Sequence, residues 1–180
     1  MTCTRWMVAP ALASGILALS HAARCEVVDA QSSGFTVRES VTIAATPARV
    51  WEALSRIGAW WDPVHTYSGD AANLSISLKP GEFWQEALPG GGVLHMVVVN
   101  AQPGRLLRLA GALGPLQAYG VAGELSLALK EAPGGTAVTQ TYDVGGHAPG
   151  GLDKLAPPVD AVLGAQLARL KQFVESSPAR

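Results

Sequence analysis

Seven side chains in this sequence combine an aromatic or chemically active type with a place where an enclosed space could form. A histidine can move a proton near neutral pH, a buried tyrosine offers a fixed hydroxyl, and an arginine can hold an anion. The candidates are Trp61, Trp84, His95, Arg108, Tyr119, Tyr142 and His147. Their spacing pairs no two of them as acid and base, so the sequence assigns no catalytic residue.

An aromatic cluster lies in residues 55–70, SRIGAWWDPVHTYSGD. On a regular element, Trp60 and Trp61 cannot both face inward. One is therefore expected to pack under the preceding helix, while the other covers the rim of the domain or shows a face to a cavity. His65 and Tyr67 follow a proline and are expected to be solvated loop residues, unless that loop folds over a pocket.

The remaining polar candidates lie in or beside strands. His95 is in VLHMVVVNA, where both faces are apolar, so parity leaves open which face meets a cavity. A histidine there is more often a satisfied core residue than a base. Tyr142 and Tyr119 are better cavity candidates, because a buried phenol is a fixed donor in an apolar wall. The apolar loop GALGPLQAYG predicts a lid or a contact surface, or simply tucks under a neighbouring element.

Several catalytic signatures are missing from the sequence. It contains neither a phosphate-binding loop ending in Lys-Ser or Lys-Thr nor a G-x-S-x-G nucleophile elbow. Its glycine-rich strings lack the dinucleotide-binding spacing. The histidines are scattered, without paired cysteines or an H-E-x-x-H motif, so no metal site and no cofactor are predicted.

The periodicity of residues 34–176 predicts one α+β domain. A strand over 35–43 is followed by a short helical pair, beginning with Thr46 as cap and Pro47 in the first turn. About six further strands follow, with turns roughly every ten residues, as in an antiparallel meander. Helical spacing from Leu155 to Val174 predicts a long final helix that covers the apolar face of the sheet.

The two ends of the chain differ in character from this domain. Residues 1–22 resemble an export signal, because Arg5 precedes the apolar run MVAPALASGILAL and small residues suit cleavage after Ala22. That run is too short to span a bilayer, so we expect a secreted or periplasmic protein with no stable membrane span after cleavage. Residues 23–33 are expected to be a flexible leader and 177–180 a tail.

The composition narrows the classes of partner. The 180 residues are 48% hydrophobic and 15% charged, which is typical of a folded domain with a sizeable core. The net charge is −1, and no basic stripe is present. Nucleic acid is therefore not expected as a partner.

The order of elements and several strings resemble the START-like, helix-grip (SRPBCC) superfamily. TPARVWEAL with WWDP resembles its usual opening. The ending TYDVGGHAPGGLDKLAPPVDAVLGAQLARLKQFVE resembles members grouped with polyketide cyclases and activators of the heat-shock ATPase. The resemblance implies a curved antiparallel sheet of about seven strands wrapped around the C-terminal helix, with two short helices after the first strand. It also implies a cavity for an apolar small molecule.

Three functions follow as hypotheses. The first is an exported carrier or sensor that binds a hydrophobic small molecule or lipid between the sheet and the final helix. The alternative is a cyclase or dehydratase in which His95 or His147 moves a proton and a tyrosine steadies an enolate. The third is a protein–protein module resembling the heat-shock ATPase activators, with the GALGPL loop as its contact surface. Neither the ligand nor the oligomeric state follows from the sequence.

Overall fold

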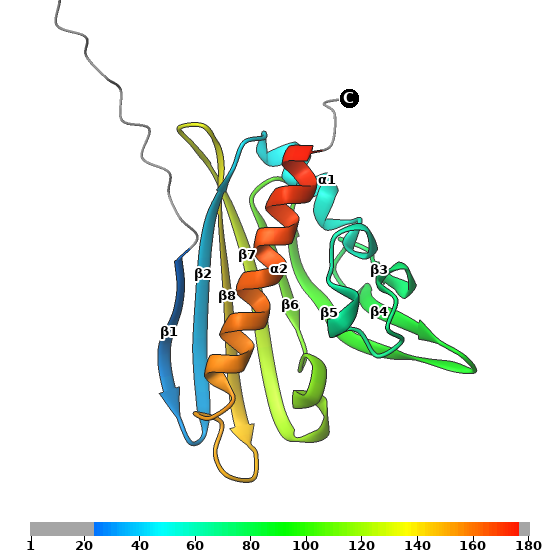
Figure 1. The fold of residues 1–180 in the computed structure, drawn as a ribbon, viewed down its shortest axis with the longest axis vertical. Helices are drawn as coiled ribbons and strands as arrows, with labels where there is room; N and C mark the ends of the chain where they lie inside the picture. The colour runs from blue at the N-terminus through cyan, green and yellow to red at the C-terminus, as the bar shows by residue number, and fades with distance from the viewer. Residues whose placement is uncertain (1–23, 177–180) are drawn as a thin grey trace, which may run out of the picture.

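A curved antiparallel sheet with a long helix across its concave face makes up the structure, a computed structural model that describes residues 24–176 (Figure 1). The described strands are β1 (Arg24–Gln31), β2 (Gly34–Ile43), β3 (Leu74–Ile76), β4 (Phe83–Leu88), β5 (Gly91–Gln102), β6 (Leu106–Ala110), β7 (Gly120–Ala132) and β8 (Gly135–His147). The α-helices are α1 (Pro47–Leu54) and α2 (Ala156–Ser176). Four 3₁₀ segments are η1 (Ile57–Ala59), η2 (Pro63–His65), η3 (Ala71–Asn73) and η4 (Gly114–Ala118).

The strands form a single sheet in the order β1-β2-β8-β7-β6-β5-β4-β3. After β2 the chain crosses to the opposite edge through α1 and the first three 3₁₀ segments, then returns strand by strand as a meander. This return ends with β8 beside β2, in register from Gly34 opposite Gly145 to Ile43 opposite Thr136. The predicted helix-grip fold is thereby confirmed, with α2 lying against the sheet that wraps it (Figure 1).

Alternating hydrophobic residues explain why the central strands face α2 as they do. In β2, Phe35, Val37 and Ile43 are buried, as their period of two predicts. In β7, Leu125 and Leu127 are buried on the same concave face. Most of the polar residues between them lie on the outer face, with Glu39 as a buried exception on the concave face, so one side of the sheet supplies the core.

The two α-helices begin and pack as the sequence predicts. The Oγ1 atom of Thr46 accepts a hydrogen bond from the backbone N–H of Arg49, and Pro47 occupies the first turn of α1. In α2, Leu163, Leu167 and Leu170 form a buried stripe against the sheet. Among the described residues, no helix is both long and apolar enough to cross a bilayer.

The N-terminal part of the described chain differs from the expected flexible leader. Residues 24–31 form the edge strand β1, which pairs with β2 from Arg24 opposite Ser40 to Gln31 opposite Gly34. Residues 26–31 are exposed, so no hydrophobic alternation marks this strand and backbone pairing carries it. This strand raises the count in the described residues to eight. The predicted signal peptide (1–22) and tail (177–180) lie outside the described residues.

Candidate functional site

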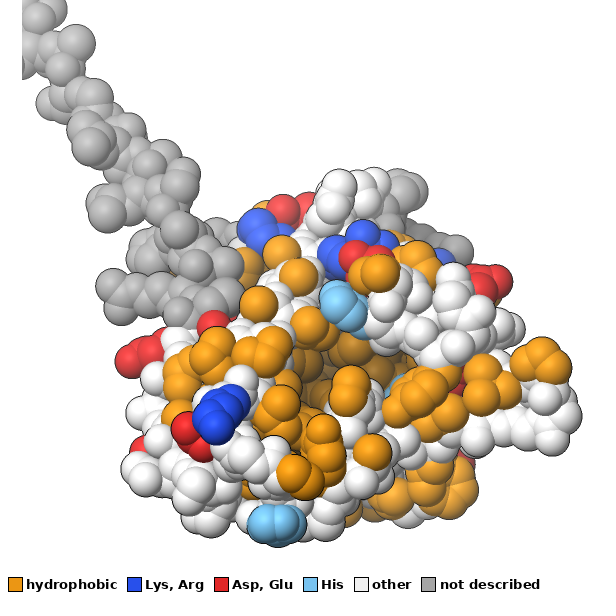
Figure 2. Space-filling view, turned by 60° about the horizontal axis from the view of Figure 1, so that its bottom comes forward, with side chains coloured by type: hydrophobic (Ala, Val, Ile, Leu, Met, Phe, Trp, Pro, Cys, Tyr) orange, Lys and Arg blue, Asp and Glu red, His pale blue; other side chains and the backbone are white. Residues whose placement is uncertain are grey.

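A cavity of about 590 Å³ lies between the concave face of the sheet and α2. Its mouth is a hollow ringed by hydrophobic side chains (Figure 2). The lining comes from the loop after η1, from β3 to β5, from the η4 segment and from the first half of α2. It consists of Trp61, Val64, His65, Thr66, Tyr67, Leu74, Trp84, His95, Leu113, Gly114, Pro115, Leu116, Tyr119, Leu155, Pro158, Val159, Val162 and Leu163.

One wall of the cavity is a run of rings. The ring centroids of Trp61 and Trp84 are 4.9 Å apart in an edge-to-face arrangement. The ring centroid of His95 lies 5.3 Å from that of Trp84 and 5.9 Å from that of Tyr67. Such contacts fix the rings in place and give the cavity a rigid, largely apolar wall.

Trp60 and Trp61 are both buried, contrary to the expectation that only one could face inward. The chain follows the 3₁₀ segment η1 here, so the two adjacent side chains need not alternate. Trp60 packs under α1 and donates its Nε1–H to the carbonyl of Ala53 at 2.9 Å. Trp61 lines the cavity and donates its Nε1–H to the carbonyl of His65 at 3.0 Å, which folds that loop over the cavity.

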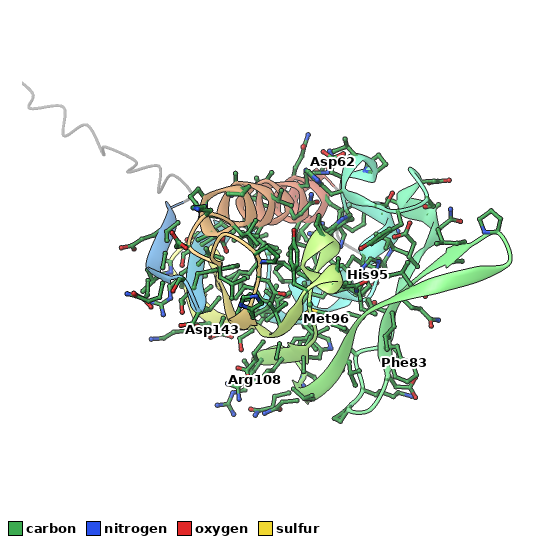
Figure 3. The ribbon with its side chains drawn as sticks, turned by 90° about the horizontal axis from the view of Figure 1, so that it is seen from below. Asp62, Phe83, His95, Met96, Arg108 and Asp143 are labelled. Carbon is green, nitrogen blue, oxygen red and sulfur yellow. The ribbon has the colours of Figure 1, made fainter. Side chains whose placement is uncertain are left out.

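His95 reaches the cavity because β5 contains a β-bulge. In β4, Trp84 pairs with Met96 and Gln85 with Leu94, so His95 is an extra residue without a partner in β4. A bulge redirects side chains, and here it buries His95 and Met96 on the concave face although they are adjacent (Figure 3). The bulge lies close to Gly111, where a Cβ would come within 2.5 Å of the His95 carbonyl oxygen.

Behind His95 lies Glu86, whose carboxylate is fully buried. Its Oε2 atom is 3.1 Å from His95 Nε2 and accepts a 3.1 Å hydrogen bond from the backbone N–H of Tyr67. Its Oε1 atom accepts from the N–H of Ser68. Burial alone raises the pKa of this carboxyl, but the hydrogen bonds from Ser68, Tyr67 and His95 outweigh it and lower the pKa below 4.5.

The predicted apolar loop forms a lid over the cavity. Leu113 and Leu116 turn inward and line it, which favours a lid over a contact surface for another protein. The hydroxyl of Tyr67 donates to the carbonyl of Gly114 at 2.9 Å and so joins the loop that contains Tyr67 to the lid beside the mouth. The Nε2 atom of Gln117 donates to the carbonyl of Leu94 at 2.9 Å, which ties the lid to β5.

The structure brings four of the seven candidate residues into the lining and leaves three outside it. Trp61, Trp84, His95 and Tyr119 line the cavity, with Tyr119 at the exposed rim. His65 and Tyr67 join them, because their loop does fold over the cavity.

The other three candidates have other roles. Arg108 lies on the outer face of β6, where its Nε atom contacts Ser126 and Glu124 (Figure 3). His147 is exposed at the end of β8. Tyr142 is buried outside the lining, and burial raises its pKa to about 12. Its hydroxyl is hydrogen-bonded to the backbone at the start of the lid. It donates to the carbonyl of Gly111 at 3.1 Å and accepts from the N–H of Leu113 at 3.0 Å.

Glu86 is the polar residue that sequence reasoning missed. It follows Trp84 by two residues in FWQEAL, so the period of a strand places both on one face. Because Trp84 was a cavity candidate, this spacing could have indicated that Glu86 lies beside the cavity too. Across residues 24–176, no three or more His, Cys, Asp and Glu side chains gather into a set that could hold a metal ion.

Three solved structures show how the fold compares. An uncharacterized protein from Rhizobium leguminosarum has a TM-score of 0.60 at 21% identity, over 87% of this chain and 99% of that chain. CalU16 from Micromonospora echinospora has a TM-score of 0.58 at 15% identity, over 87% and 88%. The di-domain ARO/CYC StfQ from the steffimycin biosynthetic pathway has a TM-score of 0.56 at 14% identity, over 80% and 51%. Similarity at these identities shows the fold alone.

Comparison with curated proteins gives no match to the chain. Comparison with family models gives one match that agrees with this fold. The model of one family, described as polyketide cyclase / dehydrase and lipid transport, matches residues 34–175, nearly the whole of the described domain. The chain therefore belongs to the polyketide cyclase / dehydrase and lipid transport family, within the START-like helix-grip superfamily.

Proposed function

We propose that this protein is an exported carrier or sensor that binds a hydrophobic small molecule in the cavity between the sheet and α2. The observation that carries the proposal is the cavity itself, about 590 Å³ in volume and lined mostly by aliphatic and aromatic side chains. That volume lies within the range of sites that enclose small molecules. An apolar ligand burying about 300 Å² gains roughly 7 kcal/mol before entropy costs, so apolar contact alone supports at most about micromolar affinity.

A cyclase or dehydratase remains the second candidate, and the His95–Glu86 pair is what favours it. A histidine held by a buried carboxylate in a cavity wall is a common arrangement for proton transfer. Of the other groups expected to assist, His147 and Arg108 lie outside the lining, the Tyr142 hydroxyl is bound by backbone atoms, and Tyr119 lines the cavity only at its exposed rim. Binding therefore has more support than turnover.

Native mass spectrometry of the full chain, expressed in a bacterium with its own leader, tests export and binding together. We expect a periplasmic or secreted product that begins at Ala23 and carries a lipophilic compound at near-equal stoichiometry. An uncleaved cytosolic product would contradict export. A protein that is empty, and that also fails to bind 1-anilinonaphthalene-8-sulfonate, would contradict the binding proposal.

A pair of variants on one helix ties that binding to the cavity. Val162 lines the cavity, whereas its neighbour Ala161 is exposed. Val162→Phe fills part of the space and is expected to weaken dye binding by at least about tenfold. Ala161→Phe adds a larger side chain on the solvent face and should leave dye binding unchanged. Equal effects of the two substitutions would place the dye elsewhere.

A further inference from the structure

The proton between His95 and Glu86 has a definite position. An ionised carboxylate only accepts hydrogen bonds, and Glu86 is held ionised by the N–H groups of Tyr67 and Ser68 that point at it. The 3.1 Å contact between His95 Nε2 and Glu86 Oε2 must therefore be an N–H donated by the histidine. In the neutral ring this leaves Nδ1 without a proton, as a hydrogen-bond acceptor.

That acceptor is open to the cavity. His95 lines the cavity, and its Nδ1 makes no hydrogen bond to any residue of the described chain. Nor is it among the buried polar atoms that lack a partner, so it is accessible from the cavity space. Burial of the ring lowers the pKa of His95 below 6.5, although the nearby Glu86 opposes this shift. The lowered pKa keeps the ring neutral at pH 7.5, so Nδ1 stays an acceptor.

Other polar atoms in this wall are already used by the protein. Trp61 Nε1 is bound to the His65 carbonyl, the Tyr67 hydroxyl to the Gly114 carbonyl, and the Thr66 hydroxyl to the Pro63 carbonyl at 2.7 Å. Trp84 differs, because its Nε1 is buried and finds no acceptor in residues 24–176. Because it is buried, the Trp84 Nε1 atom is closed to the cavity, and the unpaired acceptor on His95 is the polar atom of this wall that a ligand can reach.

We propose that Nδ1 of His95 is the specificity-determining atom of the cavity, so that the protein takes apolar molecules carrying an O–H or N–H donor and discriminates against those with acceptors only. Glu86 is a positioning residue that fixes which ring nitrogen accepts. The inference rests on the proposed binding function. An acceptor-only ligand leaves Nδ1 unpaired in an enclosed site, which is how polar groups reject close analogues.

Two probes of nearly equal size test this, 2-naphthol as a donor and 2-methoxynaphthalene as its acceptor-only ether. At pH 7.5 the wild-type protein is expected to bind 2-naphthol about tenfold more tightly, corresponding to about 1.4 kcal/mol. His95→Phe keeps the ring but removes the acceptor and should reduce the preference to about onefold. The control is His147→Phe, the same substitution at an exposed histidine outside the lining, which should keep the tenfold preference.

The outcomes separate this inference from the function on which it rests. If neither probe binds the wild-type protein, the binding function itself is wrong. If both bind equally, or if His95→Phe keeps the preference, the cavity binds ligands but His95 does not select them. Because His95→Phe also removes a partner of Glu86, a thermal melt must show that the variant is folded.

Nitrogen-15 NMR of the histidine rings in the wild-type protein gives a test that needs no variant. We expect Nε2 of His95 to carry the proton and Nδ1 to be unprotonated in the free protein. Addition of 2-naphthol should shift the Nδ1 resonance toward that of a hydrogen-bonded nitrogen, whereas 2-methoxynaphthalene should not. A proton on Nδ1 in the free protein would overturn the inference.

Discussion

Glu86 and Glu39 are both fully buried glutamates on the concave face of one sheet, yet their surroundings differ. Glu86, beside the cavity, accepts hydrogen bonds from two backbone N–H groups and from His95. Glu39, in β2 under α2, accepts one from Gln140 Nε2 at 3.1 Å, and its Oε1 has no partner in the described part of the protein. The two carboxyls are therefore equally buried, but Glu86 has three hydrogen-bond donors and Glu39 has one.

The difference shows in the pKa values of the two groups. The pKa of Glu39 is raised to about 7, chiefly by burial and further by the nearby Asp160, while the Gln140 hydrogen bond opposes this only in part. The hydrogen bonds to Glu86 instead hold its pKa below the ordinary 4.5. The number of donors decides which form of a buried acid the fold favours. Glu39 is thus suited to packing as a neutral acid, and Glu86 to orienting a neighbour as an anion.

The largest expected effect comes from removing Glu86. Glu86→Leu leaves the N–H groups of Tyr67 and Ser68 without an acceptor and His95 without its partner. We expect the free energy of unfolding at pH 7 to fall by about 3 to 5 kcal/mol, measured by chemical denaturation. Because the folded pKa is depressed, this contribution is present above pH 4.5 and is lost as the pH falls through the folded value.

The matched control for this change lies on the same strand. Gln85 is exposed on the opposite face of β4, and Gln85→Leu should alter stability by less than about 0.5 kcal/mol. A similarly small loss for Glu86→Leu would remove the contrast between the two carboxyls.

A smaller effect of opposite sign is expected at Glu39. Its folded pKa of about 7 exceeds 4.5, so the folded state binds more protons between these values and stability falls as the pH rises through this window. Glu39→Gln removes the titration while its amide oxygen can still accept from Gln140. We expect the variant to be more stable than wild type by about 3 kcal/mol at pH 8 and nearly equal at pH 4.

Denaturant unfolding across that pH range measures the effect. The same substitution at the exposed Glu26 of β1 should change stability by less than about 0.5 kcal/mol at either pH. If Glu39→Gln were destabilising at pH 8, the buried group would have to be an anion that the fold favours.

The smallest effect is expected from the neighbour of Glu39. Asp160 has an Oδ1 atom that is buried and without a partner among residues 24–176. Asp160→Asn removes a negative charge and supplies an amide that can donate to Glu39, so the pKa of Glu39 should fall. Carbon-13 NMR of the Glu39 carboxyl should show a lower titration midpoint, with about 1 kcal/mol more stability at pH 8. An unmoved midpoint would leave desolvation as the sole cause of the raised pKa.

The regular elements could be predicted because their signals are local. Alternation marks β2 and β7, and the helical stripe marks α2, so the sheet, the covering helix and a cavity between them follow from the sequence. The strand β1 could not be found in this way, because residues 26–31 are exposed and carry no alternation. Its backbone pairing with β2 leaves no hydrophobic pattern to detect.

The site was less predictable because it depends on irregular geometry and distant partners. Parity could not place His95, since the bulge in β5 breaks the alternation at that residue. Tyr142 does face inward, but its hydroxyl is bound by Gly111 and Leu113, some 30 residues earlier in the chain. Such contacts come from the tertiary fold, and no spacing within a single strand indicates them.

The bulge in β5 also makes the polarity of the cavity depend on chain length. Before the extra residue, Leu94 is 52% exposed on the outer face, and after it Met96 is buried on the inner face. Deleting His95 would restore regular pairing, with Leu94 still opposite Gln85 on the outer face and Met96 opposite Trp84 on the inner face, and the cavity wall would lose its ring nitrogen. A relative with this fold could therefore gain or lose its polar contact through one codon inserted or deleted, with every other lining residue unchanged.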